Sequence, residues 1–148
     1  MKDILHFIHG SYKPSLSGKT IEVINPATGK VYANLSSGDA QDVAAAVMAA
    51  KNASEEWGRT PLAKRQTVLQ RISDLINDNL DMFVDAEVED SGKPASLARR
   101  LDIPRAASNF AFFAAAASQL ASETHYMPGE ALNYTTRQPI GVVGCISP

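Results

Sequence analysis

The sequence predicts an α/β protein, because three regions with different periodicities follow one another along its 148 residues. Residues up to about Ser37 alternate as short strands do, and residues from Asp39 to about Leu120 repeat with helical spacing. The third region ends in the run Gly141 to Ile146, which is apolar throughout. Continuous apolar runs are typical of parallel strands that are covered on both faces. Strands, helices and a buried strand together predict helices packed on sheets.

The first region contains a predicted β-hairpin. Its two strands, Thr20 to Ile24 and Lys30 to Leu35, flank the segment Asn25-Pro26-Ala27-Thr28-Gly29, and a shorter strand, Leu5 to His9, precedes them. Proline presets the φ angle of a turn and glycine accepts a positive φ, so this segment reverses the chain.

The helical region is predicted to begin at Asp39. The carboxylates of Asp39 and Asp42 satisfy free amide groups and favour the positive end of the helix dipole. A second helix is predicted with Thr60 as its cap and Pro61 at its first position, where the missing N–H costs nothing.

A shorter helix is predicted over Asp81 to Asp90, ended by Gly92 and Pro94, and residues from Ala95 to Leu101 are helical again.

The last helix is predicted from Asp102 to about Leu120, because Pro104 fits a first turn but not a helix interior. Its expected buried face consists of Ala107, Phe110, Ala111, Ala114 and Ala117. Phe110, Phe112 and Phe113 fit either a stacking site for an aromatic ligand or close helix packing, and the neighbouring alanines favour packing.

The third region is predicted to start with a loop over Glu123 to Glu130 and a half-exposed strand over Ala131 to Arg137. The buried strand from Gly141 to Ile146 then ends just before Pro148. A parallel strand needs a crossover connection of about a dozen residues or more to reach its neighbour. We therefore expect the sequence to be truncated inside a β-α-β unit.

Composition excludes several classes of protein. A net charge of -2 with scattered basic residues predicts no nucleic-acid or membrane partner. Neither a membrane span nor a secretory signal is present, so a cytoplasmic protein is expected. The single cysteine, Cys145, excludes an internal disulfide, and its apolar surroundings favour a buried, inert thiol over a nucleophile. His6, His9 and His125 are expected to be solvated rather than catalytic.

Five segments resemble the aldehyde dehydrogenase superfamily in order and spacing. They are Val23 to Val31, Gly38 to Val47, Arg65 with Glu87, Asp90-Ser91-Gly92-Lys93-Pro94, and Tyr134 to Gly144. The resemblance covers nearly the whole chain. It implies the N-terminal part of that fold: β-hairpins, helices, an oligomerisation strand and the first strand of a Rossmann-type parallel sheet.

The resemblance also implies a domain organisation. Residues 1–125 would belong to an NAD(P)-binding domain, 126–139 to part of an oligomerisation β-arm, and 140–148 to the incomplete first strand of the sheet, with the catalytic domain absent. The expected assembly is a homodimer or homotetramer. The expected cofactor is NAD, and NADP stays open because the residues that read the ribose lie beyond Pro148.

The implied activity is oxidation of an aldehyde to a carboxylic acid through a cysteine thiohemiacetal. That chemistry needs a thiolate, an oxyanion donor, a hydride acceptor and a base. The resemblance places all of these outside residues 1–148, and Cys145 does not match the nucleophile position. The fragment itself is therefore expected to be inactive.

Two binding sites follow from the resemblance. Ile146, Ser147 and Pro148 match the segment along the adenosine side of the cofactor, at the carboxyl end of a strand, where open α/β sheets bind ligands. The alternative for Ser147 is a hydroxyl that caps the loop.

A monovalent cation would be held by backbone carbonyls of Val23 and Ile24 and by the side chain of Asp90, because hard cations prefer oxygen ligands. The alternative, which we favour at this point, is that Asp90 caps a turn or helix.

The segments Ser96 to Arg105 and Asn109 to Ala114 resemble the branch that acts on 2-aminomuconic and 2-hydroxymuconic semialdehydes, and Gly144 to Pro148 agrees with it. Those substrates carry carboxylates, which arginines pair bidentately. The arginines in question are Arg99, Arg100 and Arg105. Their alternative role, which we favour, is as solvated helix charges or interface contacts.

A general or betaine-type aldehyde dehydrogenase is the second candidate. A noncatalytic helical interaction module is the third candidate. The exposed apolar terminal strand argues against it, because an unpaired hydrophobic edge promotes aggregation.

Overall fold

Strands and helices follow one another much as predicted in the computed structural model, which describes residues 2–146. The strands are β1 (Lys2–Ile4), β2 (His6–Ile8), β3 (Ser11–Lys13), β4 (Thr20–Asn25), β5 (Lys30–Ser36), β6 (Thr124–Met127) and β7 (Ala131–Tyr134). The helical segments are α1 (Ala40–Arg59), α2 (Leu62–Asp78), α3 (Leu80–Ser91), α4 (Ala95–Leu97), the π-helical turn η1 (Ala98–Asp102), α5 (Ile103–Ala116) and the 3₁₀ turn η2 (Ala117–Gln119).

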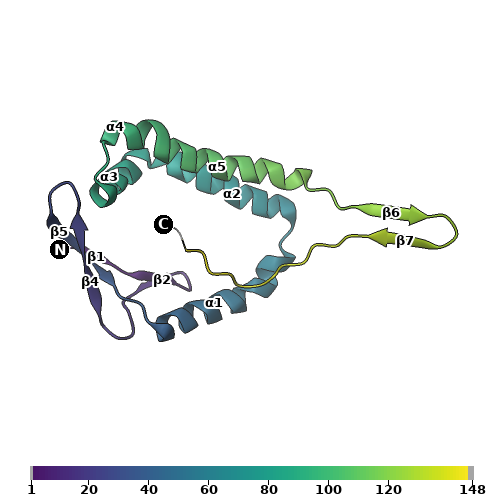
Figure 1. The fold of residues 1–148 in the computed structure, drawn as a ribbon, viewed down its shortest axis with the longest axis horizontal. Helices are drawn as coiled ribbons and strands as arrows, with labels where there is room; N and C mark the ends of the chain where they lie inside the picture. The colour runs from purple at the N-terminus through teal and green to yellow at the C-terminus, as the bar shows by residue number, and fades with distance from the viewer. Residues whose placement is uncertain (1, 147–148) are drawn as a thin grey trace.

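Among residues 2–146 the strands form three separate sheets. The largest has the order β1-β5-β4, with β1 parallel and β4 antiparallel to β5. The hairpins β2-β3 and β6-β7 form two-stranded sheets. Figure 1 shows β6-β7 extending away from the helices, with α2 and α5 side by side and α1 apart from them. The N-terminal sheet therefore lies at the opposite end of the molecule from the projecting hairpin.

The predicted hairpin turn is confirmed. The Asn25 Oδ1 atom accepts hydrogen bonds from the backbone N–H groups of Ala27 at 2.9 Å and Thr28 at 3.2 Å, and Gly29 has a φ of 68°. The side chain of Asn25 thus mimics a backbone turn, which explains why the chain reverses here.

The predicted start of α1 at Asp39 is also confirmed. Asp39 Oδ1 accepts hydrogen bonds from the N–H groups of Gln41 and Asp42 at 2.8 and 3.3 Å. The Asp42 carboxylate in turn accepts one from the N–H of Asp39 at 3.0 Å, which completes a capping box.

The prediction that Thr60 caps the second helix is wrong. The Thr60 hydroxyl donates to the carbonyl oxygen of Glu56 at 3.1 Å, and its N–H donates to that of Trp57 at 3.1 Å. Thr60 therefore ends α1, because its short side chain bonds back to the preceding turn. Pro61 precedes α2, which has no side-chain cap.

Helices α2 and α5 pack through small side chains. Ala107 and Ala114 of α5 are 2% and 5% exposed, and Gln66 Nε2 donates to the Ala114 carbonyl oxygen at 2.8 Å. The prediction that the phenylalanines pack inside is wrong: Phe110 is 37% exposed, and Phe112 and Phe113 are 64% and 62% exposed. The alanines occupy the contact with α2, and the rings of Phe112 and Phe113 pack on each other edge to face, with their centroids 5.2 Å apart.

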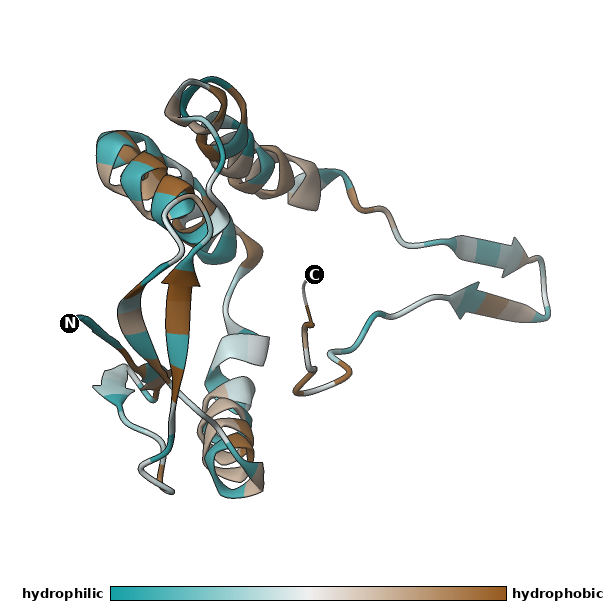
Figure 2. Ribbon diagram, turned by 60° about the vertical axis from the view of Figure 1, so that its left-hand side comes forward, coloured by the Kyte–Doolittle hydropathy of each residue, from teal (hydrophilic) through white to brown (hydrophobic). Residues whose placement is uncertain are grey.

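A small apolar core joins α3, η1 and α5. Val84, Ala98 and Ile103 are 1%, 0% and 8% exposed, and partly buried side chains of Ile76, Leu80 and Val88 pack against them. Gly92 ends α3 in the left-handed region, as predicted. Figure 2 shows apolar residues also along the helices and in the final segment.

The last region differs from the prediction in two ways. Thr124–Met127 forms strand β6, not a loop, and pairs with β7. Gly141 to Ile146 has no strand structure, and Ile146 is 99% exposed. A strand needs hydrogen-bonding partners on a neighbour, and no strand within residues 2–146 lies beside this segment. Cys145 is consequently exposed, not buried as expected.

None of the helices among the described residues is long and apolar enough to cross a membrane.

Candidate functional site

The predicted cation ligands Val23 and Ile24 lie at a β-bulge. Val23 pairs with Ala33 but Ile24 pairs with Val31, so the pairing skips Tyr32 of β5. A bulge disrupts the hydrogen-bond ladder locally and redirects the side chain of the extra residue. The backbone is therefore irregular at the two residues, Val23 and Ile24, whose carbonyls the family resemblance predicts as ligands.

Asp90 is tied to this bulge by Tyr32. The Tyr32 hydroxyl donates a hydrogen bond to Asp90 Oδ1 at 3.0 Å. Partial burial raises the pKa of the Tyr32 phenol, and the hydrogen bond to Asp90 raises it further, so the phenol stays protonated at neutral pH. The favoured expectation that Asp90 caps a turn or helix is wrong, because its carboxylate bonds to the sheet.

Gly92 brings the turn after α3 onto the hairpin turn of the sheet. Its φ is 69°, and a Cβ atom at this position would lie 2.9 Å from Pro26 Cγ. Only glycine meets both conditions, since other residues disfavour this φ and their Cβ would clash with a rigid ring. The end of α3, including Asp90, is thereby packed next to the strand that carries Val23 and Ile24.

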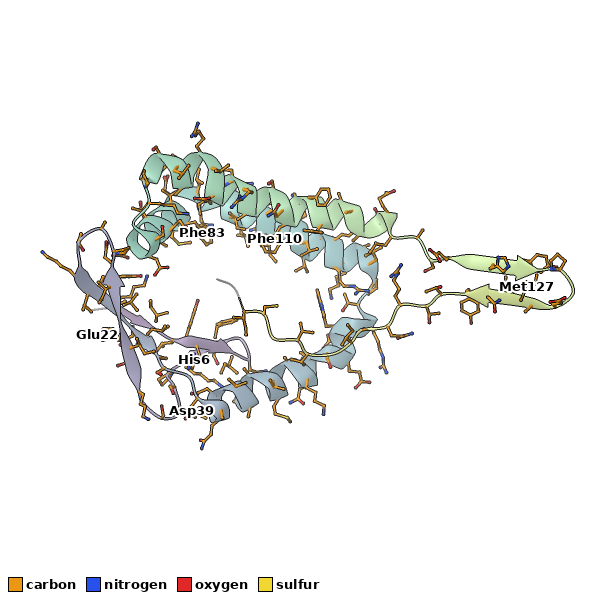
Figure 3. All side chains as sticks on the ribbon, viewed as in Figure 1. His6, Glu22, Asp39, Phe83, Phe110 and Met127 are labelled. Carbon is orange, nitrogen blue, oxygen red and sulfur yellow. The ribbon has the colours of Figure 1, made fainter. Side chains whose placement is uncertain are left out.

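A shallow groove lies beside Asp90. Its lining is Lys2, Ile4, Tyr32, Phe83, Ala86, Glu87, Glu89, Asp90 and Ile103. Figure 3 labels Phe83 on α3, on the side toward the strands. In residues 2–146 there is no cluster of three or more histidine, cysteine or acidic side chains able to hold a metal. One carboxylate with backbone carbonyls suits a weakly held hard cation rather than a transition metal.

Lys93 stabilises the turn after α3 through two ion pairs. Its Nζ atom lies 2.7 Å from Glu87 Oε1 and 2.8 Å from Asp102 Oδ2. The hydrogen bond to Asp102 and that to Glu87 raise the pKa of Lys93, so the ammonium is fully charged. Lys93 therefore joins the end of α3 to the start of α5 by pairing with Glu87 and Asp102.

The predicted cofactor residues are only partly described. Ile146 ends the described chain with a fully exposed side chain, and Ser147 and Pro148 lie outside the described residues. Ile146 presents its backbone and an apolar side chain to solvent, which is compatible with contact to an adenosine. The structure does not bring it together with the groove at Asp90.

A second polar cluster, which the sequence did not predict, surrounds Asp42. Asp42 is 5% exposed and accepts hydrogen bonds from the Leu16 N–H at 2.9 Å, the Ser15 hydroxyl at 2.7 Å and the Asp39 N–H at 3.0 Å. The bond from Leu16, followed by that from Ser15, lowers the pKa of Asp42. The cluster fastens the chain after β3 to the start of α1.

The expectation that His6 is solvated is wrong. Its Nε2 atom is buried without a hydrogen-bond partner, 3.9 Å from Asp42 Oδ2, and a Cβ at Gly38 would lie 3.3 Å from it. Figure 3 shows His6 above the start of α1, near Asp39. The ring packs closely because position 38 has no side chain. Ser15 bonds the carboxylate directly rather than the imidazole, so this is not the arrangement of a serine nucleophile with its base.

The arginines of the predicted substrate-specific segment behave mainly as exposed charges. Arg99 pairs with Asp81, and the guanidinium of Arg105 lies 3.7 Å from Asp102. The side chains of Arg99 and Arg105 are 51% and 65% exposed.

Comparison with known proteins assigns the class of this fold. A sequence profile described as "Aldehyde dehydrogenase family" matches residues 12–148, and the chain belongs to that family. The NAD⁺ complex of aldehyde dehydrogenase from Bacillus cereus superposes with a TM-score of 0.89 at 31% identity, covering 94% of this chain and 29% of that one. The fold is thus the mixed α/β N-terminal portion of aldehyde dehydrogenase structures, which confirms the predicted resemblance.

Two curated relatives belong to a narrower group within this family, the muconic semialdehyde dehydrogenases. The chain is 43% identical over 153 residues to 2-hydroxymuconic semialdehyde dehydrogenase of Pseudomonas sp. (strain CF600), covering 100% of this chain and 32% of that protein. It is 42% identical over 144 residues to 2-aminomuconic semialdehyde dehydrogenase of Danio rerio, and the match covers 97% of this chain and 29% of that protein. The chain therefore spans about a third of the length of these relatives.

Proposed function

We propose that the protein carrying this chain oxidises a muconic semialdehyde to the carboxylic acid with NAD⁺, and that residues 1–148 form part of the scaffold of its cofactor-binding domain. The observation that carries this proposal is the similarity, along essentially the whole chain, to semialdehyde dehydrogenases that act on hydroxy- and aminomuconic substrates. The α/β fold and its match to an NAD⁺ complex support the cofactor.

The chemistry itself would come from residues outside this chain. A cysteine thiolate would add to the aldehyde to form a thiohemiacetal, and NAD⁺, when bound, supplies the hydride acceptor. Ile146, Ser147 and Pro148 would contact the adenosine side of the cofactor. Cys145 takes no part, because the family comparison does not place it at the nucleophile position.

The same proposal includes an assembly. Residues 126–139, which contain the second half of β6 and all of β7, would form part of an arm that joins subunits into a homodimer or homotetramer. The exposed apolar side chains of Tyr126, Leu132 and Tyr134 on this hairpin support an interface.

The proposal also includes a monovalent cation held by the carbonyls of Val23 and Ile24 and the carboxylate of Asp90. Three observations support it: the bulge at Val23 and Ile24, the hydrogen bond from Tyr32 to Asp90, and the packing of Gly92 on Pro26.

The substrate is tested with the product of the complete reading frame. NADH absorbance would be followed with 2-hydroxymuconic semialdehyde and, in parallel, with betaine aldehyde. We expect kcat/KM for the semialdehyde to be at least about a hundredfold higher, because a site that pairs a substrate carboxylate rejects analogues that lack it. A preference for betaine aldehyde would favour the betaine-type alternative. Absence of NADH formation with both would remove the enzyme proposal.

A further inference from the structure

We propose that Tyr32 is a positioning residue for the cation site, holding the Asp90 carboxylate against the bulge so that one of its oxygens is engaged by the phenol and the other serves the cation. This inference rests on the cation site proposed above. It concerns a side chain that the family resemblance did not single out.

The geometry supports this role in two ways. Tyr32 is the residue that the strand pairing skips, between the partners of Val23 and Ile24, so it belongs to the same irregularity as these two proposed ligands. Its hydroxyl then spans from the sheet to α3 and bonds Asp90 at 3.0 Å. Tyr32 thus connects the bulge next to Val23 and Ile24 with the side chain of Asp90.

Asp90 needs such a constraint. Its side chain is exposed on the last turn of α3, where an unconstrained carboxylate samples several rotamers and loses entropy on binding. The hydrogen bond from Tyr32 restricts those rotamers before a cation arrives.

The chemistry of the donor also fits. A neutral phenol orients a carboxylate without cancelling its charge, whereas the ammonium of Lys93 pairs with Glu87 at 2.7 Å and neutralises it. The Asp90 carboxylate is therefore oriented beside the groove by a hydrogen bond from a neutral donor.

The experiment measures the affinity of the protein for Na⁺ and K⁺. The urea midpoint would be recorded against NaCl or KCl, with tetramethylammonium chloride holding ionic strength constant, because a ligand that binds the folded state raises stability in proportion to its saturation. We expect Tyr32→Phe to weaken cation affinity about tenfold, as loss of a hydrogen bond to a ligating carboxylate does. Tyr12→Phe, which removes the hydroxyl of a tyrosine that is 73% exposed, is the matched control and should leave affinity unchanged.

Two further variants separate the possible outcomes. Asp90→Asn should abolish the cation response, and Asp90→Glu, which keeps the charge but displaces the carboxylate, should weaken it as Tyr32→Phe does. Wild-type affinity in Tyr32→Phe, with loss in Asp90→Asn, would overturn the role of Tyr32 and leave the cation site in place. No response in the wild-type protein would remove the cation site and this inference with it. If Tyr32→Phe does not fold, wild-type affinity in Asp90→Glu overturns the proposal, because the carboxylate would then need no fixed position.

Discussion

Substitution of Gly92 by alanine tests whether the turn after α3 packs on the hairpin turn. Alanine in the left-handed conformation costs about 1–2 kcal/mol. At Gly92 the new Cβ would also lie 2.9 Å from Pro26 Cγ, a contact that the rigid ring cannot relieve by rotation. Overpacking of this kind adds about 1–3 kcal/mol. We therefore expect Gly92→Ala to lower the free energy of unfolding by about 2–5 kcal/mol.

Gly29 provides a matched control. Its φ of 68° is nearly that of Gly92, but a Cβ there meets nothing within 4 Å. Gly29→Ala should therefore cost only the backbone strain, about 1–2 kcal/mol. Both variants would be measured by equilibrium unfolding in urea, with the slope m expected to stay constant. Equal losses in the two variants would refute the contact with Pro26, and with it the packing that brings Asp90 to the sheet.

Three further predictions concern side chains outside this contact. Hydrogen bonds hold the pKa of Asp42 in the folded protein below its ordinary value of 3.8. The stability that they provide is complete above pH 3.8 and is lost as the pH falls through the lower folded pKa. Asp42→Asn should therefore flatten the acid side of a plot of urea midpoint against pH. An unchanged acid side would contradict this. The pKa of Lys93 is raised, so its pH dependence is the reverse: the stability that its ion pairs contribute is complete below pH 10.5 and is lost as the pH rises through the folded pKa. Lys93→Met should lower the urea midpoint at neutral pH but not at strongly alkaline pH. Equal midpoints of the variant and the wild-type protein at neutral pH would contradict a stabilising role of the Lys93 ion pairs. Cys145 is exposed and should react with Ellman's reagent in the native 148-residue chain as fast as a free thiol, whereas protection would mean that the final segment is buried.

Features with local causes could be predicted from the sequence. The Asn25 turn and the Asp39 cap depend on hydrogen bonds between residues two or three positions apart, so the residue types suffice. Thr60 shows the limit of this reasoning, because its hydroxyl can cap the next helix or bond back to the previous one, and the structure has the second. The run from Gly141 to Ile146 has the composition of a buried strand, but composition does not supply the neighbouring strands that a sheet requires.

The candidate site was predictable only in part. Asp90 and the two carbonyls follow from the resemblance, but Tyr32 does not, because a bulge leaves no mark in an alternating pattern and its contact with Asp90 spans 58 positions. The Asp42 cluster was missed for the same reason, since Ser15 and Asp42 are 27 positions apart. A buried carboxylate that closes a capping box looks like any other helix start in sequence.

We propose that residues 1–148 supply scaffold and that the groups that perform the oxidation lie elsewhere in the protein. The most direct measurement compares NADH formation from 2-hydroxymuconic semialdehyde and NAD⁺ by the isolated 148-residue chain and by the product of the complete reading frame. We expect turnover by the complete product and none by the isolated chain. Clear turnover by the isolated chain would contradict the account, because a nucleophile would then have to lie within these residues.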